Sequence, residues 1–514
     1  MTKITKSISI VTILLLFSKF FAFLREMVIA AYYGATYLTD AYNMAVVIIS
    51  LSTAVISAGV ATVIIPMYNH KRIQQSKEVA DLFVNNILWI TSLFYFILSM
   101  VGIIFAPALV KIFAPNFNAE AAVLTTNIIR IIFIFTIAAN ISNYMKSITK
   151  IYDKFAITAI AIYPSAIFPI IFTFFFAKRI GIYALVISYI LFLLVQASMY
   201  IISVRKVFHF KAFLNFKNGD LRDVFKLSLP IYIQVGVWEI NMIIDKMLAS
   251  GLPEGSISAM AYALRLRELP HGIITISVTT VIFPLISQYA AKKDFSNMKS
   301  LTVKGISLLT IAFLPIISVS IYYATEITRI VYERGAFTSE RTTLTAGIFI
   351  FTVSSLVFIG GATLLCNAFY SMQDTKTPQF AAVISVICNI ILNLILVQYM
   401  QAAGLALATS IASFIQFLIL FIQFRRKLGA FGGAVFLKNM AKCAIATAAM
   451  VPVFLLCELL RDKLSLFLFF ATAAAISLCI YAVLLYLLKV DLFIEMLVRA
   501  NGYLKNQRLI RRSK

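Results

Sequence analysis

The sequence predicts an all-α polytopic membrane protein with fourteen transmembrane helices. Of its 514 residues, 61% are hydrophobic and only 13% are charged. Apolar stretches of about 20 residues, the length that a helix needs to cross a bilayer, recur from one end of the chain to the other. The expected spans cover residues 8–33, 37–66, 82–112, 121–145, 155–177, 181–204, 227–249, 257–288, 305–325, 343–370, 378–400, 403–424, 434–458 and 464–488.

The basic residues predict how these spans are oriented. An even number of spans places both termini on the same side of the membrane. The loops that follow even-numbered spans are richer in Lys and Arg than the loops on the opposite side, which places the termini and the basic loops in the cytoplasm. Most of the net charge of +24 then reflects this topology and attraction to membrane lipid headgroups, so nucleic-acid binding is not implied.

Several kinds of site are not indicated by the sequence. The five cysteines form no CxxC pair, so neither a disulfide framework nor a zinc site is expected. The three histidines are isolated from one another, and no phosphate-binding GxxxxGK[ST] loop occurs. We therefore expect no bound nucleotide and no cofactor other than a sodium ion, which is discussed below.

A faint internal repeat predicts the domain organisation. The stretch REMVIAAYYGATYLTDAYNMA, followed by VIIPMYNHKR, has a counterpart about 220 residues later in DKMLASGLPEGSISAMAYALR, followed by VIFPLISQYAAKK. The copies lie six spans apart, so they share one orientation and would be related by an axis along the membrane normal. We expect two six-helix lobes (residues 1–218 and 219–430), two further helices (431–490) and a basic cytoplasmic tail (491–514). Such symmetry fits transporters better than membrane enzymes.

Charged residues inside the expected spans predict the functional site. The stretch YALRLRELPHG, residues 262–272, places charges in an apolar run, where each costs about 2.5–3.5 kcal/mol near the bilayer centre. If the two lobes face each other, Arg25 and Arg265 line a common cationic cavity. Glu268 lies three residues after Arg265 on the same helical face, so it is expected to orient that guanidinium. Arg267 points roughly the opposite way. The alternative is a static salt bridge that holds helices together.

Seven motifs resemble one family. In this order and spacing, the sequence contains LREMVIAAYYG, TDAYNMA, YALRLRELPHGI, VIFPLIS, ERGAFT, AFYSMQDTKTP and GLALATS. Together they resemble the MurJ (MviN) family of the multidrug/oligosaccharidyl-lipid/polysaccharide exporter superfamily, over residues 8–430. The resemblance implies a fourteen-helix flippase that moves lipid II, the undecaprenyl-diphosphate-linked peptidoglycan precursor, from the inner to the outer leaflet. It also implies that the last two helices form a groove for the polyprenyl tail.

The resemblance also assigns residues to the headgroup cavity. Arg25 matches an arginine of the family's first helix, and Glu26 stands next to it where Asp is frequent. Arg265 and Glu268 match the family's Y-A-x-R-L-x-x-x-P motif, and Asp40 matches an aspartate of the second helix. Arginine suits this role because its planar fork matches the oxygens of a diphosphate. The alternative for Asp40 is an exposed residue at a helix N-terminus.

Two departures from the family pattern leave the carried headgroup open. Many relatives have an arginine pair where this chain has Ser52 and Thr53, and an acid where it has Leu264. The predicted cavity is therefore less charged than in such relatives. Another polyprenyl-diphosphate glycan would be able to use the same arginines.

A second polar group predicts a sodium site. Asp245 lies within the seventh span, Asn389 and Asn393 share one face of the eleventh, and Thr409 lies in the twelfth. Carboxylate, amide and hydroxyl oxygens are the ligands that a hard cation prefers, and the resembling family places a sodium site here. The alternative is a structural role in which Asp245 pairs with Lys246 or bonds between helices.

These observations together predict a transporter rather than an enzyme. The expected function is translocation of lipid II, or of a related undecaprenyl-diphosphate glycan, by alternating access in the bacterial cytoplasmic membrane. Two alternatives from other classes are a cation-coupled small-molecule antiporter of the same superfamily and a membrane enzyme acting on a polyprenyl substrate. We expect a monomer whose partners are its lipid substrate, the surrounding membrane lipids and the cell-wall synthesis machinery.

Overall fold

The computed structural model describes residues 3–217, 219–429 and 433–498, and all regular secondary structure within these ranges is helical. The all-α fold predicted from the sequence is confirmed. Among the described helices, nine are long and apolar enough to cross a membrane, or up to eleven if each of two bent helix pairs is one span. The chain is therefore a multi-pass membrane protein, while the count of fourteen spans stays a prediction.

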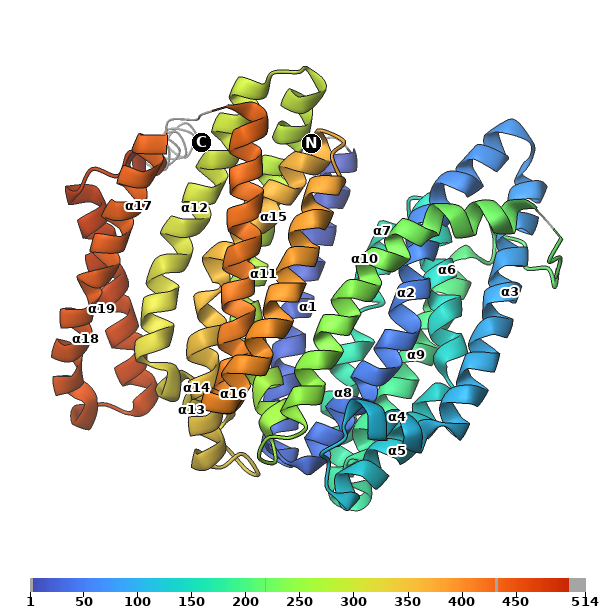
Figure 1. Cartoon of the computed structure of the whole chain (residues 1–514), viewed down its shortest axis with the longest axis horizontal. Helices are drawn as coiled ribbons and strands as arrows, with labels where there is room; N and C mark the ends of the chain where they lie inside the picture. Colours follow the sequence, from blue (N-terminus) through green and yellow to red (C-terminus); the bar gives the residue numbers. More distant parts are fainter. Residues whose placement is uncertain (1–2, 218, 430–432, 499–514) are drawn as a thin grey trace, which may run out of the picture. The chain divides into compact units, whose positions relative to one another are not determined.

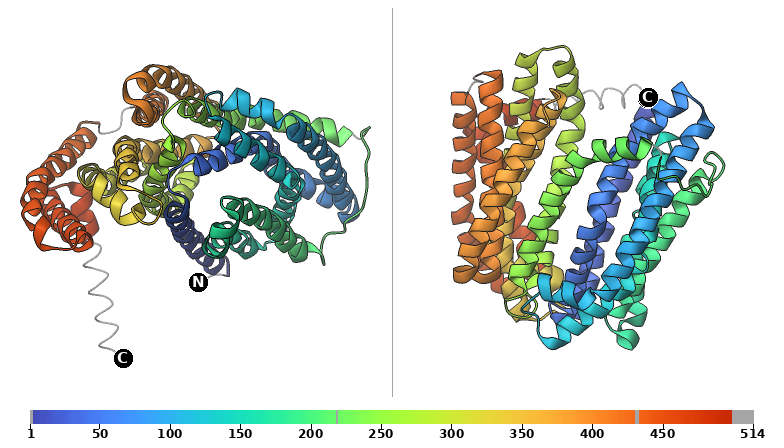
Figure 2. Two further views of the ribbon diagram at one scale, coloured as in Figure 1. Left: turned by 90° about the horizontal axis from the view of Figure 1, so that it is seen from below. Right: turned by 45° about the vertical axis from the view of Figure 1, so that its right-hand side comes forward.

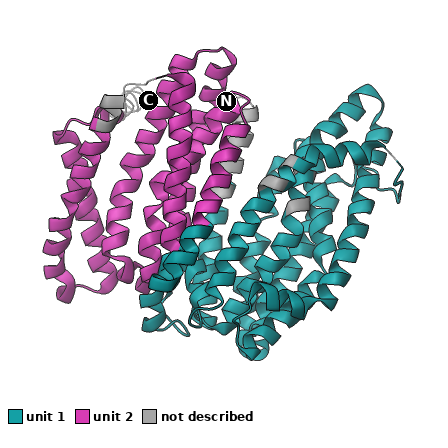
Figure 3. Ribbon diagram, in the orientation of Figure 1, with its two compact units in different colours: residues 1–265, 332–344, 390–405 teal, residues 266–331, 345–389, 406–514 magenta. Residues whose placement is uncertain are grey.

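The chain divides into two compact units (Figure 3). Unit 1 comprises residues 1–265, 332–344 and 390–405, and unit 2 comprises residues 266–331, 345–389 and 406–514. The predicted lobes and the predicted pair of C-terminal helices stay predictions. Most of the predicted basic tail, residues 499–514, lies outside the described residues.

Unit 1 contains the first ten helices (Figure 1). Capping side chains explain where several of them begin: Ser76 accepts a hydrogen bond from the Val79 amide at the start of α3, and Asn118 does the same for Ala121 at the start of α5. Gly34, with a φ of +64°, adopts a left-handed conformation between α1 and α2. The helices are α1 (Lys3–Tyr33), α2 (Tyr37–Gln74), α3 (Lys77–Ile104), α4 (Ala106–Phe113), α5 (Ala119–Phe133), α6 (Thr136–Ile151), α7 (Phe155–Ile160), α8 (Pro164–Ile180), α9 (Tyr183–Val204) and α10 (Gly219–Ala249).

The second half of the chain forms the remaining helices. Asp294 accepts a hydrogen bond from the Asn297 amide and so caps the start of α12. The helix that carries the YALRLRELPHG motif is α11, which begins in unit 1 and continues into unit 2. The elements are α11 (Ser256–Ala291), α12 (Phe295–Tyr322), α13 (Ala324–Tyr332), α14 (Ser339–Ser354), α15 (Leu356–Ser371), α16 (Lys376–Leu428), α17 (Gly433–Ala448), α18 (Met450–Cys457), the 3-10 helix η1 (Glu458–Lys463) and α19 (Leu466–Leu487).

Helix α16 is made of two arms. It contains 53 residues, a length of about 80 Å at about 1.5 Å per residue, which is more than twice the bilayer's apolar thickness of about 30 Å. Gln401, with φ 52° and ψ −132°, interrupts the helical backbone. The arms on either side correspond to the two spans predicted at residues 378–400 and 403–424.

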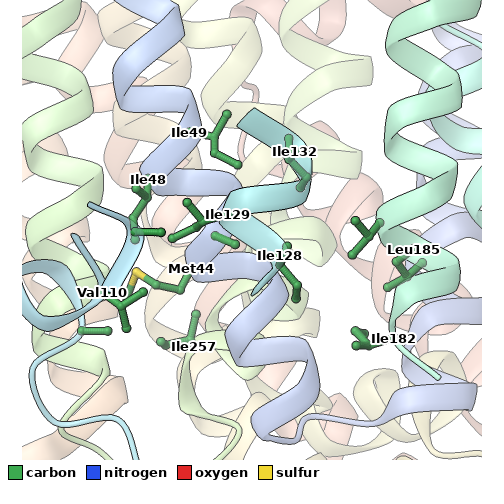
Figure 4. Close-up of a cluster of buried hydrophobic side chains, with 14 of the residues drawn as sticks. Met44, Ile48, Ile49, Val110, Ile128, Ile129, Ile132, Ile182, Leu185 and Ile257 are labelled. Atoms are coloured by element: carbon green, nitrogen blue, oxygen red, sulfur yellow. The ribbon is translucent and has the colours of Figure 1, made fainter. Parts of the chain in front are cut away.

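A buried apolar cluster joins the helices of unit 1. Helices α2, α4, α5 and α9 contribute to it, and Met44, Ile48, Val110, Ile128 and Leu185 are among its members (Figure 4). Lipid tails are as apolar as these side chains, so the helices are held together mainly by close packing rather than by exclusion of water.

In unit 2, α17 and α19 pack on α12, and α18 packs on α17 and α19; Figure 2 shows these last helices in red next to the yellow α12. Their shared core includes Met450, Phe454 and Phe469, and the rings of Phe454 and Phe469 meet the ring of Tyr323 edge to face. The Tyr481 hydroxyl of α19 donates a hydrogen bond to the Ile311 carbonyl of α12 at 3.0 Å. This polar contact fixes the position of α19 along α12.

Candidate functional site

Two of the predicted arginines share one acid within unit 1. The Glu26 Oε1 atom lies 2.5 Å from Nη2 of Arg25 and 3.3 Å from Nε of Arg265. Arg25 also donates from Nη1 to the Ser165 carbonyl of α8 at 3.1 Å. Glu26 is buried, whereas the Arg265 side chain is 48% exposed. Helices α1 and α11 therefore bring both arginines to one acid, Glu26, which is their common counter-ion. The cationic cavity that the two arginines are expected to line stays a prediction.

The predicted pairing of Arg265 with Glu268 is wrong. Glu268 is paired with Arg267, whose Nη2 lies 2.7 Å from the Glu268 Oε1, and its other oxygen lies 3.8 Å from Nδ1 of His271. The Arg267 side chain is largely buried and also lies 3.5 Å from the Ser355 hydroxyl. The spacing of three residues predicted that Glu268 would pair with Arg265. In the structure, the Glu268 carboxylate instead forms its ion pair with the adjacent Arg267. The direct participation of Glu268 in headgroup binding stays a prediction.

Asp40 connects α2 to the first turn of α11. Its Oδ2 accepts a hydrogen bond from the Gly255 amide at 2.7 Å, and its Oδ1 accepts from the Ser258 amide at 2.7 Å and the Ser258 hydroxyl at 2.6 Å. A carboxylate at this place satisfies backbone donors and complements the helix dipole. Asp40 is buried, so the alternative of an exposed residue is wrong. Its contact with a headgroup stays a prediction.

An aromatic group holds the next turn of α11. The Tyr262 hydroxyl donates to the Gly34 carbonyl at 3.0 Å, and the Tyr332 hydroxyl donates to the Tyr262 carbonyl at 3.2 Å. The rings of Tyr262 and Phe337 meet edge to face at a centroid distance of 5.6 Å. Tyr262 lies three residues before Arg265, so these contacts limit the movement of the turn that carries this arginine.

The four predicted sodium ligands form two pairs. In unit 1, the Asn393 amide donates to Asp245 Oδ1 at 2.6 Å. In unit 2, the Asn389 amide lies 3.4 Å from the Thr409 hydroxyl. Both asparagines are buried, and amide, carboxylate and hydroxyl oxygens are the kinds of ligand that a hard cation such as sodium prefers. The union of both pairs in one sodium site stays a prediction.

Lys246 adds a cation to this region of unit 1. It is buried, and it lies within electrostatic range of Asp40, Asp245 and Glu26. Lys246 is the partner that Asp245 would have in the structural alternative to a sodium site. It interacts with three acids rather than with Asp245 alone. Because Lys246 is buried and acts electrostatically on Arg265 as well as on these acids, it contributes to the positive potential around Arg265.

The sequence reading missed one intramembrane acid. Glu239 of α10 lies in the expected span 227–249, and its Oε2 accepts a hydrogen bond from the Ser50 hydroxyl of α2 at 3.2 Å. The signal was present, because Glu239 and Asp245 are both acids in one apolar run, and only Asp245 was singled out.

Comparison with known proteins identifies the family. A family model described as "Lipid II flippase MurJ" matches residues 29–475. The "Probable lipid II flippase MurJ" of Rickettsia prowazekii is 30% identical over 410 residues, covering 79% of this chain and 80% of the relative. The protein of the same name from Borreliella burgdorferi is 27% identical over 422 residues, covering 80% of this chain and 81% of the relative.

Solved structures agree with these sequence relatives. A structure described as "Lipid II flippase MurJ, inward closed conformation" is similar with a TM-score of 0.81 and 26% identity, covering 94% of this chain and 99% of the other. An inward-facing multidrug resistance MATE transporter of the MOP superfamily matches with a TM-score of 0.67 and 12% identity, covering 80% of this chain and 94% of that one, which shows a shared fold. Since the family model covers most of the sequence, the chain belongs to the lipid II flippase MurJ family.

Proposed function

We propose that this protein carries lipid II from the inner to the outer leaflet of the bacterial cytoplasmic membrane. The observation that carries the proposal is the pair of guanidinium groups, Arg25 and Arg265, gathered around Glu26 on helices of an apolar chain. The family relatives supply the identity of the substrate, because they are named as lipid II flippases. The proposed activity is transport and involves no covalent step.

The diphosphate of the substrate would replace Glu26 as the partner of the arginines. A diphosphate offers more negative charge and more acceptor oxygens than one carboxylate, and a guanidinium binds phosphate oxygens in a two-pronged manner. The half-exposed Arg265 side chain is accessible for this exchange. Because the guanidinium groups are already held in place, binding would exchange one set of charge-assisted hydrogen bonds for another and would avoid the cost of ordering free side chains.

The proposal includes fourteen spans and two lobes that alternate in access. Eleven spans become fourteen when both arms of α16 are counted and when α1 and α10 are included. Each of these two helices has 31 residues, or about 46 Å, which exceeds the apolar thickness of about 30 Å. An even count would place both termini on the side of the basic loops, the cytoplasm.

We propose that sodium resets the empty transporter. No nucleotide-binding motif is present in the sequence, so the membrane potential or an ion gradient would supply the energy. A cation held by Asp245, Asn389, Asn393 and Thr409 would bring a positive charge into a field worth about 2.3 kcal/mol per charge per 100 mV. Release of the anionic headgroup would leave the arginines with Glu26 alone, and the field acting on the cation would then favour return to the inward-facing state.

The substrate is tested by depleting the protein in its own host. Lipid II should accumulate in the inner leaflet, as measured by extraction of polyprenyl-linked intermediates and by their protection from an externally added modifying enzyme. Accumulation of a different polyprenyl-diphosphate glycan would assign the cavity to that glycan. If no such intermediate accumulates, the flippase proposal is wrong.

The site is tested by substituting the two arginines. Arg25→Ala and Arg265→Ala should each abolish complementation of the depleted strain, because each removes charge-assisted contacts of about 1.5–3 kcal/mol. Arg25→Lys and Arg265→Lys should rescue incompletely, since lysine lacks the planar fork. Arg130→Ala is the matched control, because Arg130 is an exposed arginine of α5. Normal growth with either alanine variant at Arg25 or Arg265, at normal protein levels, would remove that residue from the site.

A further inference from the structure

The connection between α9 and α10 contains a stretch of extended chain that lies along α3, all within unit 1. We call residues 208–217 the strap; its sequence is FHFKAFLNFK. Residues 209–215 have no regular secondary structure of their own. Extended backbone beside a membrane-spanning helix requires partners for its amides and carbonyls, because unsatisfied groups are costly where water is scarce.

Two asparagines of α3 supply those partners. Asn85 donates to the His209 carbonyl at 2.7 Å and accepts from the Lys211 amide at 3.1 Å. Asn86 donates to the Asn215 carbonyl at 3.0 Å and accepts from the Asn215 amide at 2.6 Å. Each carboxamide thus pairs with strap backbone through one donor and one acceptor, as a neighbouring strand would. Both asparagine side chains are buried beneath the strap.

Two more side chains of α3 extend this attachment. The Asp81 Oδ2 accepts from the His209 amide at 3.3 Å, and the Trp89 indole N–H donates to the Lys211 carbonyl at 3.1 Å. Asp81, Asn85 and Trp89 are spaced four residues apart, which places them in one row on the helix. The strap is therefore fastened along about 12 Å of α3, the rise of eight residues.

The length of α3 indicates the depth of the strap. The helix has 28 residues, or about 42 Å, of which the apolar core of a bilayer covers about 30 Å. Residues 82–104 carry no charged side chain, and this run is about 34 Å long, so a core of about 30 Å that ends with the helix at Ile104 spans roughly its last 20 residues. The apolar core would therefore begin next to Asn86, and the strap would lie where hydrocarbon gives way to headgroups.

The outward side chains of the strap have the chemistry of that boundary. Phe213, Leu214 and Phe216 are 37%, 52% and 59% exposed, and Lys211 and Lys217 are exposed beside them. Aromatic residues prefer the membrane interface, and lysines near it are attracted to anionic lipid. The strap begins at Phe208, which is buried in the core of unit 1.

We propose that the strap is an interfacial anchor that binds anionic phospholipids, with Phe213, Leu214 and Phe216 in the headgroup–acyl boundary and Lys211 and Lys217 on phosphate groups. Asn85 and Asn86 lower the energetic cost of placing the strap at this depth, because they form hydrogen bonds with its backbone amides and carbonyls. The lipid bound here belongs to the surrounding bilayer and is distinct from the transported cargo. The inference therefore goes beyond the proposed transport function.

The first test measures phospholipid binding to the full-length protein by native mass spectrometry, with phosphatidylglycerol and phosphatidylcholine as probes. The wild type should retain phosphatidylglycerol in preference to phosphatidylcholine. Lys211→Gln/Lys217→Gln should lower the apparent affinity for phosphatidylglycerol about fivefold per lysine, the equivalent of about 1 kcal/mol for each basic residue near an anionic surface. The matched control is Lys292→Gln/Lys293→Gln, which removes two exposed lysines after α11. This control should lower the apparent affinity for phosphatidylglycerol less. Equal losses in the two double variants would overturn the headgroup assignment.

The second test measures depth in nanodiscs. Phe213→Trp is introduced with Trp238→Phe, and the emission of Trp89, measured in Trp238→Phe alone, is subtracted, so that the Trp89 contact with the strap is kept. Phospholipids brominated near the carbonyl end of the acyl chain should quench the fluorescence of the introduced tryptophan, whereas aqueous iodide should not. Adding Asn85→Ala/Asn86→Ala should reverse this pattern by releasing the strap. Quenching by iodide alone before that release would place the strap in water and overturn the proposal. Neither test depends on lipid II transport, so both outcomes are independent of the proposed function.

Discussion

Glu26 lies 2.5 Å from Arg25 and 3.3 Å from Arg265, so one acid serves two arginines. The three groups together keep one net positive charge. A site of this composition attracts an anion without requiring that the arginines be free of partners. It also makes Glu26 the residue on which the arrangement of both guanidinium groups depends.

Glu26→Gln should therefore destabilise the protein. Removing one member of a buried ionic group leaves uncompensated charge and costs about 3–5 kcal/mol of unfolding free energy. Chemical denaturation in detergent micelles measures the change. Glu120→Gln, at an exposed acid of α5, is the control and should have little effect. Wild-type stability of Glu26→Gln would show that the arginines do not need this counter-ion.

Sodium should alter the thermal stability of the purified protein, and Asp245→Asn should remove this response while the fold is preserved. Asp245 supplies the carboxylate of the predicted site and is held by the Asn393 amide, so the variant keeps a polar side chain but loses the charge that binds a cation. The measurement is the melting temperature in sodium and in potassium at equal ionic strength, because simple screening would act through both salts. An unchanged sodium-specific shift in Asp245→Asn would leave Asp245 as a packing residue.

Gly255→Ala should be among the most destabilising single-methyl changes. Gly255 has a φ of +87°, which an L side chain rarely adopts, and an added Cβ would collide with the Ala35 carbonyl. We expect a loss of at least about 1–3 kcal/mol in unfolding free energy. Gly347→Ala in α14 is the matched control, because a Cβ there meets no atom within 4 Å and alanine favours a helix by up to about 1 kcal/mol. Equal effects of the two variants in a denaturant titration would contradict this reading.

Stability should fall in acid as Asp374, in the loop before α16, becomes protonated. Burial opposes its ionisation, but hydrogen bonds from Lys427 at 2.8 Å and from the Thr377 amide and hydroxyl hold its pKa at about 2, below the usual 3.8. A lowered folded-state pKa stabilises the protein above the unfolded pKa, and this contribution is lost between pH 3.8 and about 2. Asp374→Asn should lose this part of the pH dependence in thermal melts, whereas Glu340→Gln, at an exposed acid, should keep it. Identical pH profiles of the wild type and Asp374→Asn would exclude the ion pair as a contributor.

Much of the fold was predictable because bilayer thickness sets the length of apolar segments. Each expected span corresponds to one helix, to consecutive short helices, or to one arm of α16. The exact number of crossings was not confirmed, because bent pairs such as α5 and α6, which meet at 47°, are ambiguous by length and composition alone.

Partner choice was less predictable than position. Arg25 and Arg265 were expected to meet, and they do. Glu268, rather than Glu26, was expected to be the acid partner of Arg265. Helical periodicity identifies possible partners on the same helix, but it gives no information about an acid on another helix, such as Glu26 of α1. The hydrogen bonds of Asn85 and Asn86 to the strap were invisible for the same reason, since 124 and 129 residues separate Asn85 from His209 and Asn86 from Asn215.

The contacts of Asp40 have a rotational consequence for α11. The Gly255 and Ser258 amides both bond to its carboxylate, so the first turn of this helix has a fixed angular setting about its own axis. One residue step turns a helix by about 100°, and Arg265 lies about two turns farther along. A slip of one residue at Asp40 would therefore swing the guanidinium group away from Glu26. By fixing the rotation of α11 about its own axis, Asp40 sets the direction in which the Arg265 side chain points.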